Sequence, residues 1–263
     1  MTVVYYHANC SDGMASAFAC KLVHPDWTYT PINYDQEINF PPENKFFCDF
    51  CPTFEEIKKM AKDGYSITIL DHHKTRQGDF DKALSENLIK GIFDLNRSGA
   101  GISYDYFKPP VPRDLFSIIE SRDLWKFDVA GARELNAFLS KGLSFETLKE
   151  AMDDLPKAIE LGKELQKQAD VIVDKCCDNY YIDKICGVEM PVVNSPMKQS
   201  EICNKLLEMT GFPVSACWYK SGDMLRYSLR SIKEYDCSEL AKKHGGGGHR
   251  TASGFSIKEG NKT

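Results

Sequence analysis

The first hundred residues alternate between short β-rich runs and helical stretches, and this alternation constrains the fold more than any other feature of the chain. The β-rich runs predict strands at 2–7, 45–49, 66–70 and 91–95, and an alanine-rich run predicts a helix at 14–23. Strands that alternate with helices form βαβ units, whose strands lie parallel in one sheet. We therefore predict an α/β fold whose N-terminal domain is built on a parallel sheet.

Helices dominate the middle of the chain. Thr53 and Glu56 have the spacing of a capping box, which predicts a helix from there to Gly64. Helical spacing returns at 99–107, 113–125 and 143–152, and a longer helix follows at about 156–178. This longer helix has no sustained heptad, which favours a linker between two domains over a coiled coil.

After the long helix the sequence predicts a smaller α/β domain. Strands are expected at 187–194, 213–219 and 223–231, and helices at 198–210 and 237–243. The predicted organisation is a larger domain at 1–150, a linker helix at 151–177 and a smaller domain at 178–263.

The composition of the chain limits the kinds of molecule that we expect it to bind. A formal net charge of −5 argues against a broad grip on long nucleic acid, although a short ligand could still bind in a local basic pocket. No apolar run approaches the roughly 20 residues that span a bilayer, and the first residues do not resemble a signal peptide. We therefore expect a cytoplasmic protein without a membrane partner, and 10 cysteines that are reduced thiols.

Side chains that bind metals follow the predicted strands. His7, Asp49 and Asp71 fall at or just past strand ends, and open α/β sheets bind ligands at the carboxyl ends of their strands. Asp12 follows the first strand closely, and Asp123 lies late in a predicted helix. Each residue alone could be a solvated surface group, but together they predict a site for two metal ions.

The run Asp71-His72-His73 is the strongest local signal, because three potential ligands or proton carriers adjoin at one strand end. The alternative is that the histidines face opposite ways on a surface loop. Carboxylate and imidazole ligands suit manganese, zinc or iron, and magnesium less well. Two ions that share a bridging carboxylate lower the pKa of a water and offset the charge that develops on phosphorus. We expect two divalent ions, most simply Mn²⁺.

A glycine run near the C-terminus is the second signal. Four glycines separate His244 from His249 and Arg250, and backbone amides in such a loop can cradle a phosphate. Arg226 and Arg230 have the same side-chain parity on one predicted strand, so both could face one groove. The alternatives are a flexible glycine-rich loop and, for Arg226, a solvated face.

These elements occur in the order HANCSDG, FCDF, DHH, SRDLW, SLRS, GGGGHRTASGF, over nearly the whole chain. This order resembles the DHH phosphoesterase family with its DHH-associated C-terminal domain. Relatives in that family include RecJ-type exonucleases, nanoRNases and cyclic-dinucleotide phosphodiesterases. A DHH run followed by a distant GGGH motif is far more specific than either motif alone.

The resemblance implies a role for each matching residue. It implies metal ligation by His7, Asp12, Asp49, His72 and Asp123, with Asp49 shared by both ions. It also implies that Asp71 orients His72 and that His73 donates to the scissile phosphate. The implied substrate-binding residues are Arg230, Gly246, Gly247, Gly248, His249 and Arg250, with Asn96 and Ser98 close by.

Cys10 departs from the family, whose first motif usually carries two aspartates. Three outcomes are open: the thiolate binds metal directly, Asn9 or water fills the position, or the first site is weak until substrate adds ligands. A thiolate would bias the site toward a softer ion such as zinc or iron. The sequence favours the weak site, with His7, Asp12 and Asp49 as its remaining ligands.

The function that follows is hydrolysis of a phosphodiester by metal-activated water. The small size and the acidic charge favour short oligonucleotides or linear dinucleotides as substrate. The alternatives are cleavage of cyclic dinucleotides, phosphatase action on a nucleotide, and a nucleotide-binding regulator that has lost catalysis. The sequence leaves open whether the chain forms a homodimer.

Overall fold

The computed structural model describes residues 2–34 and 40–260, and the chain divides into two compact units, Met1–Gln166 and Lys167–Thr263. The division falls inside the long helix α8 (Leu155–Cys177). The three-part organisation at 1–150, 151–177 and 178–263 stays a prediction.

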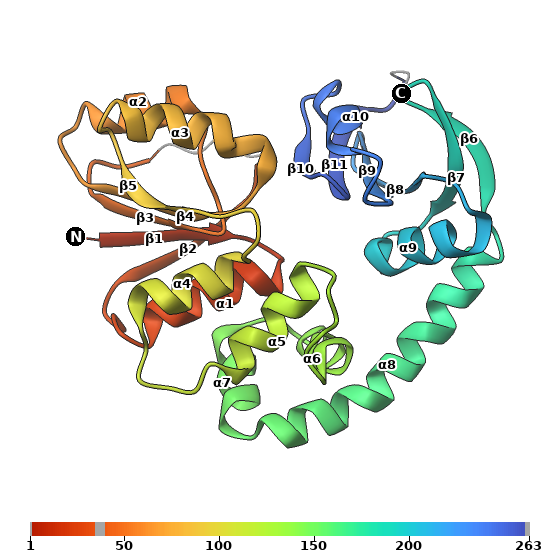
Figure 1. The fold of residues 1–263 in the computed structure, drawn as a ribbon, viewed down its shortest axis with the longest axis horizontal. Helices are drawn as coiled ribbons and strands as arrows, with labels where there is room; N and C mark the ends of the chain where they lie inside the picture. The colour runs from red at the N-terminus through yellow and green to blue at the C-terminus, as the bar shows by residue number, and fades with distance from the viewer. Residues whose placement is uncertain (1, 35–39, 261–263) are drawn as a thin grey trace. The chain divides into compact units, whose positions relative to one another are not determined.

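The first unit is built on a five-stranded sheet in which all neighbouring strands run parallel (Figure 1). The strand order is β2-β1-β3-β4-β5. The strands are β1 (Thr2–His7), β2 (Thr28–Ile32), β3 (Asn44–Cys48), β4 (Ile67–Asp71) and β5 (Lys90–Phe93). The predicted α/β class and its parallel sheet are confirmed.

Helices cover both faces of this sheet. Helices α2 (Phe54–Ala61) and α3 (Gln77–Ser85) lie on one face, and α1 (Ser11–Lys21) and α4 (Gly99–Phe107) lie on the other (Figure 1). A short 3₁₀ helix, η1 (Lys74–Arg76), leads into α3. The predicted capping box is present at the start of α2, where Thr53 and Glu56 bond reciprocally.

Apolar side chains fix these layers. Ile57 of α2 packs with Phe47 and Ile69 of the sheet, so one face of the sheet is buried beneath α2 and α3. Further helices, α5 (Asp114–Asp123), α6 (Ala132–Leu139) and α7 (Phe145–Asp153), join α1 and α4 through a second core. Leu70 of the sheet packs with Ala17 of α1 and Ile102 of α4, so the central strands are buried on both faces, which is typical of parallel sheets.

The second unit contains a six-stranded mixed sheet in the order β10-β11-β9-β8-β7-β6. Only the β7–β8 pairing is parallel. Its strands are β6 (Tyr181–Ile185), β7 (Val188–Asn194), β8 (Val214–Ser221), β9 (Met224–Ser231), β10 (Gly247–His249) and β11 (Ala252–Lys258), and its helices are α9 (Gln199–Thr210) and α10 (Ser238–Lys242).

Some elements differ from their predicted form. Helix α1 begins at Ser11, three residues before the predicted start, so Asp12 lies in the first helical turn and not in a loop. Strands β2, β6, β10 and β11 and helices α3 and α6 were not predicted from the sequence. No helix in the described part of the chain is both long enough and apolar enough to cross a bilayer.

Candidate metal centre

The carboxyl ends of β1, β3 and β4 bring three groups of polar side chains together. His7 ends β1, Asp49 follows β3 directly, and Asp71 ends β4. These strands are immediate neighbours in the order β1-β3-β4 and run parallel, so their carboxyl ends meet at one edge of the sheet. The sheet topology therefore gathers residues that are up to 64 positions apart in the chain, as between His7 and Asp71.

Asp49 lies between two histidines. Its Oδ2 atom is 3.5 Å from His7 Nδ1, and its Oδ1 atom is 3.0 Å from His72 Nε2. The carboxylate is 1% exposed. Asp49 has a φ of 58°, a left-handed conformation that aspartate tolerates better than most residues. The two oxygens thus face two different imidazoles, which is the arrangement that a bridging carboxylate requires.

Asp12 is held by the N-terminus of another helix. Its Oδ2 and Oδ1 atoms accept hydrogen bonds from the backbone N–H groups of Gly99 (2.6 Å) and Ala100 (3.0 Å) in α4. A Cβ at Gly99 would lie 2.6 Å from Asp49 Cβ and 2.9 Å from Asp12 Oδ2, so this position accepts no side chain. Ser98 caps the same helix by accepting from Gly101 N. These backbone contacts were not predicted from the sequence.

His72 lies between Asp49 and two further carboxylates, those of Asp12 and Asp123. Its Nε2 atom lies 3.5 Å from Asp12 Oδ2 and 3.7 Å from Asp123 Oδ2, in addition to the contact with Asp49. Asp123 is the last residue of α5. Among the described residues of this unit, potential ligand atoms lie within 4.8 Å of one another in three groups. Two of them, His7 with Cys10 and Asp49, and Asp12 with His72 and Asp123, are the two ligand sets; the third is Asp49 with Asp71 and His73.

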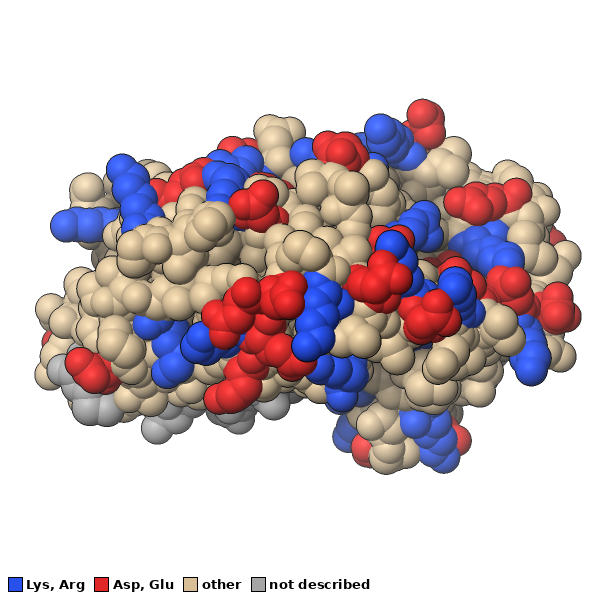
Figure 2. Space-filling model, turned by 90° about the horizontal axis from the view of Figure 1, so that it is seen from below, with Lys and Arg blue, Asp and Glu red and all other residues tan. Residues whose placement is uncertain are grey.

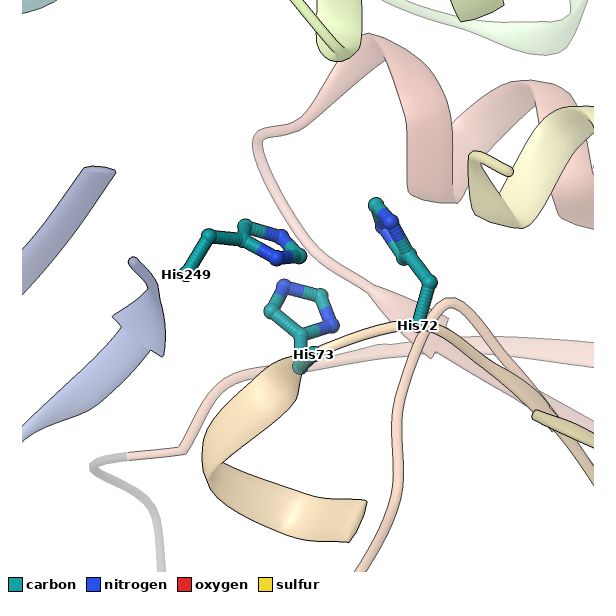
Figure 3. Close-up of side chains that lie close together, drawn as sticks. All are labelled: His72, His73 and His249. Atoms are coloured by element: carbon teal, nitrogen blue, oxygen red, sulfur yellow. The ribbon is translucent and has the colours of Figure 1, made fainter. Parts of the chain in front are cut away.

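Asp71 lies beside His73, and the expectation that it orients His72 stays a prediction. The Nδ1 atom of His73 lies 2.7 Å from Asp71 Oδ1, within hydrogen-bond distance. Figure 3 shows His72 and His73 projecting from the segment that follows β4. Adjacent residues thus have different nearest partners: His72 Nε2 lies nearest to Asp49 Oδ1, and His73 Nδ1 lies nearest to Asp71 Oδ1, with Asp49 Oδ1 at 3.8 Å.

An aromatic side chain that was not predicted for the site borders it. The ring of Tyr34 lies 5.6 Å from that of His7 and 5.7 Å from that of His73, and it stacks on Phe50 at 4.1 Å. No motif in the sequence marks this tyrosine, because it follows β2, a strand that the sequence did not reveal.

The carboxylates and imidazoles shift one another's pKa values. Burial, with repulsion from Asp123 and Asp49, raises the pKa of Asp12 from 3.8 to about 8. Burial alone would lower the pKa of His7 and His72, but their neighbours outweigh it and raise the pKa of both rings well above 6.5. For His7 these neighbours are Asp49 and Cys10, and for His72 they are the surrounding carboxylates. Burial opposes a low pKa at Asp49, but His7, His72 and His73 together bring it well below 3.8.

The residues present fit a divalent cation. Two buried carboxylates, Asp12 and Asp49, and the partly exposed Asp123 converge here, and like charges at such distances are costly unless a cation or protons offset them. His7 Nδ1 and Asp49 Oδ2 are buried without a hydrogen-bond partner among the described residues. A buried polar atom without a partner costs about 1–3 kcal/mol, and a bound cation would supply the partner. Carboxylate and imidazole donors suit manganese, zinc and iron.

Asn96 and Ser98, which were expected near the substrate, stay predictions. Asn96 lies on an exposed turn where its N–H donates to Asp94. Ser98 is fully buried and its hydroxyl is used as the helix cap. The cap is a structural reason for a serine at this position.

In the second unit, the glycine run forms a hairpin strand. Residues 247–249 pair with 252–254 as β10 and β11. Gly248 has a φ of 131°, and a Cβ there would lie 2.5 Å from Ala252 O. The close hairpin therefore needs glycine at this position for its own geometry. Phosphate binding by Gly246, Gly247 and Gly248 stays a prediction.

His249 and Arg230 share one face of the second sheet. Both lie directly opposite Ala252, His249 on β10 and Arg230 on β9, and directly opposed residues point to the same face. Arg230 Nη2 donates to Ser200 Oγ at 2.6 Å, so a serine of α9 orients the guanidinium. The small Ala252 side chain leaves His249 and Arg230 as the large polar groups of this row.

Arg250 has a different set of partners. Its Nε and Nη2 atoms donate to the backbone oxygens of Lys233 and Glu234 at 2.8 and 3.2 Å. These bonds tie the hairpin to the loop that precedes α10. The guanidinium thus has a structural role within this unit, and a role in binding substrate stays a prediction.

Comparison with known proteins identifies the family. Residues 191–263, which contain the glycine hairpin, match the DHHA1 domain. The DHH run at Asp71–His73 lies in the other unit, at the carboxyl edge of the parallel sheet. The chain belongs to the DHH superfamily. The relative matched along most of both chains is the uncharacterized protein R106 of Acanthamoeba polyphaga mimivirus, 31% identical over 97% of this chain and 67% of its own.

Solved DHH-type structures share the fold. A pGpG-specific phosphodiesterase, PggH from Vibrio cholerae, matches with a TM-score of 0.51 and 14% identity over 98% of this chain and 93% of its own. An exopolyphosphatase-related protein from Bacteroides fragilis matches with a TM-score of 0.50 and 13% identity over 99% and 87%. At these identities the likeness establishes a common fold.

Proposed function

We propose that this chain is a metal-dependent phosphodiesterase that hydrolyses short oligonucleotides or linear dinucleotides. The observation that carries the proposal is the position of Asp49, whose two carboxylate oxygens face His7 on one side and His72 on the other. Two divalent ions held there would supply an activated water at neutral pH and offset negative charge on the phosphoryl group.

In this proposal the other residues of the first unit hold the metal ligands in place or bind the scissile phosphate. Asp49 belongs to the first ligand set and contacts His72 of the second, and the N-terminus of α4 fixes the Asp12 carboxylate. His73 is oriented through Nδ1 by Asp71, and in this proposal its Nε2 donates a hydrogen bond to the scissile phosphate. A ring that is already oriented loses little freedom when substrate binds, which favours it as a donor.

The second unit supplies the substrate grip in this proposal. His249 and Arg230 lie in one row of the sheet, and Arg230 is oriented by Ser200. Two such donors can hold a terminal phosphate through charge-assisted hydrogen bonds. A DHHA1 match over residues 191–263 supports a common role for this region within the superfamily.

Charge favours a short substrate. The net charge is −5, and on the face shown in Figure 2 acidic and basic side chains are interspersed, without a continuous basic stripe among the coloured residues. Long nucleic acid is bound through many phosphate contacts on a basic surface. The description of PggH as pGpG-specific gives a phosphodiester of the proposed chemical class within the same fold.

A substrate panel tests this proposal. Purified protein with manganese is incubated with a linear dinucleotide, a cyclic dinucleotide, oligonucleotides of increasing length, a nucleotide phosphate and pyrophosphate, and the products are resolved by mass. We expect mononucleotides from the linear dinucleotide at the highest rate, and a rate that falls with chain length. Fastest turnover of the cyclic dinucleotide or the nucleotide phosphate would replace the proposed substrate. Tight binding of the dinucleotide without products would favour a regulator.

The panel needs a variant that tests the site as well as the substrate. Asp49→Asn removes the shared charge with little change of shape, and Asp26→Asn makes the same substitution at an exposed acid of the same unit. Activity that survives Asp49→Asn would show that the turnover arises elsewhere, from a contaminant or another site.

A further inference from the structure

Cys10 stands at the position before the first residue of a helix, but its side chain does not cap that helix. It is the N-cap of α1, with the extended backbone of a cap (φ −124°, ψ 131°), yet its side chain makes no capping hydrogen bond. Serine, threonine, aspartate and asparagine are the residues that stabilise this position, and cysteine is a poor substitute. Helix capping therefore gives no reason for a cysteine here.

The thiol instead lies with two metal-binding side chains. The Cys10 sulfur, a His7 ring nitrogen and an Asp49 carboxylate oxygen all lie within 4.8 Å of one another. His7 Nδ1 and Asp49 Oδ2 are 3.5 Å apart and are buried without a hydrogen-bond partner among the described residues. Two buried polar atoms and a thiol therefore converge on one point.

Asp12 does not complete this set. Its carboxylate accepts two backbone hydrogen bonds from α4 and groups with His72 and Asp123. The sequence favoured a weak first site with His7, Asp12 and Asp49 as ligands. The geometry changes that interpretation, because the third side chain beside His7 and Asp49 is the cysteine.

We propose that His7, Cys10 and Asp49 form a metal site in which the Cys10 thiolate is a direct ligand, and that this site selects zinc, iron or cobalt over manganese and magnesium. Thiolate ligands favour softer ions, whereas the second set, Asp12, His72 and Asp123, offers only oxygen and nitrogen. The thiol proton is released to solvent as the sulfur–metal bond forms. The inference rests on the proposed metal centre but not on the proposed substrate.

The number of ligands fits a site that works on substrate. Zinc sites that are structural take four protein ligands, whereas catalytic zinc sites take three and keep one position open. The nitrogen, sulfur and oxygen of His7, Cys10 and Asp49 make three. The fourth position is then available to solvent or to a substrate oxygen.

Cobalt binding reports on the sulfur directly. The full-length protein is stripped with EDTA and titrated with Co²⁺, and absorption from thiolate-to-cobalt charge transfer is recorded in the near ultraviolet. We expect this band in the wild type, its loss in Cys10→Ser, and its retention in Cys176→Ser, which alters a partly exposed thiol in the other unit. Serine is a better N-cap than cysteine, so Cys10→Ser should fold, and a melting curve in EDTA checks this.

Competition titrations measure selectivity. Zinc affinity should fall at least about 10-fold in Cys10→Ser, because even the loss of an outer partner of a metal ligand costs about 10–100-fold. Cys10→Asp should shift the preference from zinc toward manganese. A charge-transfer band that persists in Cys10→Ser, or bound cobalt without this band in the wild type, would overturn the thiolate assignment alone. A wild-type protein that binds no cobalt, zinc or manganese would overturn the metal centre as well.

Discussion

At the carboxyl edge of the first sheet, polar side chains are buried against one another, whereas in the β10–β11 hairpin the conspicuous residues mostly serve their own backbone. His7 and Asp49 each have a buried atom with no hydrogen-bond partner in the described part of the chain, and Asp12 has a pKa raised to about 8. In the hairpin, Gly248 meets the need of a tight pairing, and Arg250 bonds to two carbonyls. Perturbed pKa values and unsatisfied polar atoms therefore mark the sheet edge as a candidate site of chemistry. The glycine-rich motif of the hairpin is equally conspicuous in the sequence, but the needs of the fold explain most of it.

Two matched glycine substitutions should separate the regions most strongly. Gly99→Ala places a Cβ 2.6 Å from Asp49 Cβ, so the cluster must move, and we expect metal binding and activity to be lost together. Gly248→Ala strains the hairpin but leaves the first unit intact, so bound metal should be unchanged while substrate use weakens. Elemental analysis and turnover on the same preparations decide between them, and normal metal content in Gly99→Ala would contradict the placement of α4 against the site.

The Asp71–His73 pair should act on turnover and not on metal binding. His73→Gln removes the proposed donor to phosphate, and we expect kcat to fall by about 100-fold or more, as for other groups that move or share a proton in the transition state. Asp71→Asn loosens the ring and should cost less. Steady-state kinetics with parallel metal analysis gives the answer, and a loss of metal in His73→Gln would reassign this residue as a ligand.

Substitutions in the second unit should distinguish residues that bind substrate from residues that stabilise the fold. Arg230→Gln and His249→Ala should each lower kcat/KM by about 10–100-fold, the size of one lost charge-assisted hydrogen bond, with metal content unchanged. Arg250→Gln should instead lower the melting temperature and leave kcat/KM near that of the wild type, because its bonds tie the hairpin to a loop. If Arg250→Gln proves as damaging to catalysis as Arg230→Gln, the hairpin has a more direct role than its backbone bonds indicate.

A pH series should show the smallest effect, on stability. In metal-free protein, folded Asp12 keeps a proton up to about pH 8 that the unfolded chain has released near pH 4, so folding is penalised as pH rises through that interval. His7 and His72 have raised pKa values, so the stability they give below pH 6.5 is also lost as pH rises. Both effects have the same sign. The EDTA-treated protein should melt at a lower temperature at pH 8 than at pH 5.5.

Metal should reverse this trend, because its ligands must lose their protons before they bind, and bound metal then stabilises the fold. Melting temperatures with and without a divalent ion across the same pH range test the reversal. If the melting temperature changes with pH in the same way with and without the metal, these side chains do not exchange protons for metal.

The sequence could predict that the polar residues at the strand ends lie together, because this depends only on the parallel arrangement of the strands. His7, Asp49 and Asp71 follow neighbouring parallel strands, and such strand ends coincide in space. The start of α1 was placed three residues late because Ser11, Asp12 and Gly13 are weak helix formers and cysteine is an unusual cap.

The division of ligands could not be predicted in the same way. Which of Cys10 and Asp12 faces His7 depends on the rotation of α1, and that rotation is fixed by backbone N–H groups of α4, 87 and 88 residues beyond Asp12. Strands β10 and β11 escaped prediction because a glycine run lacks the β-branched and aromatic residues that mark a strand.

Metal stoichiometry in Asp49→Asn tests the central claim most directly. The protein is stripped, reloaded with excess divalent metal, freed of unbound ions and analysed for metal per chain, alongside the wild type and Asp26→Asn. Because the Asp49 carboxylate contacts a histidine of each ligand set, we predict two ions per chain in the wild type and in Asp26→Asn, and weakened occupancy of both positions in Asp49→Asn. Two ions retained in Asp49→Asn with wild-type affinity would contradict a shared, bridging carboxylate.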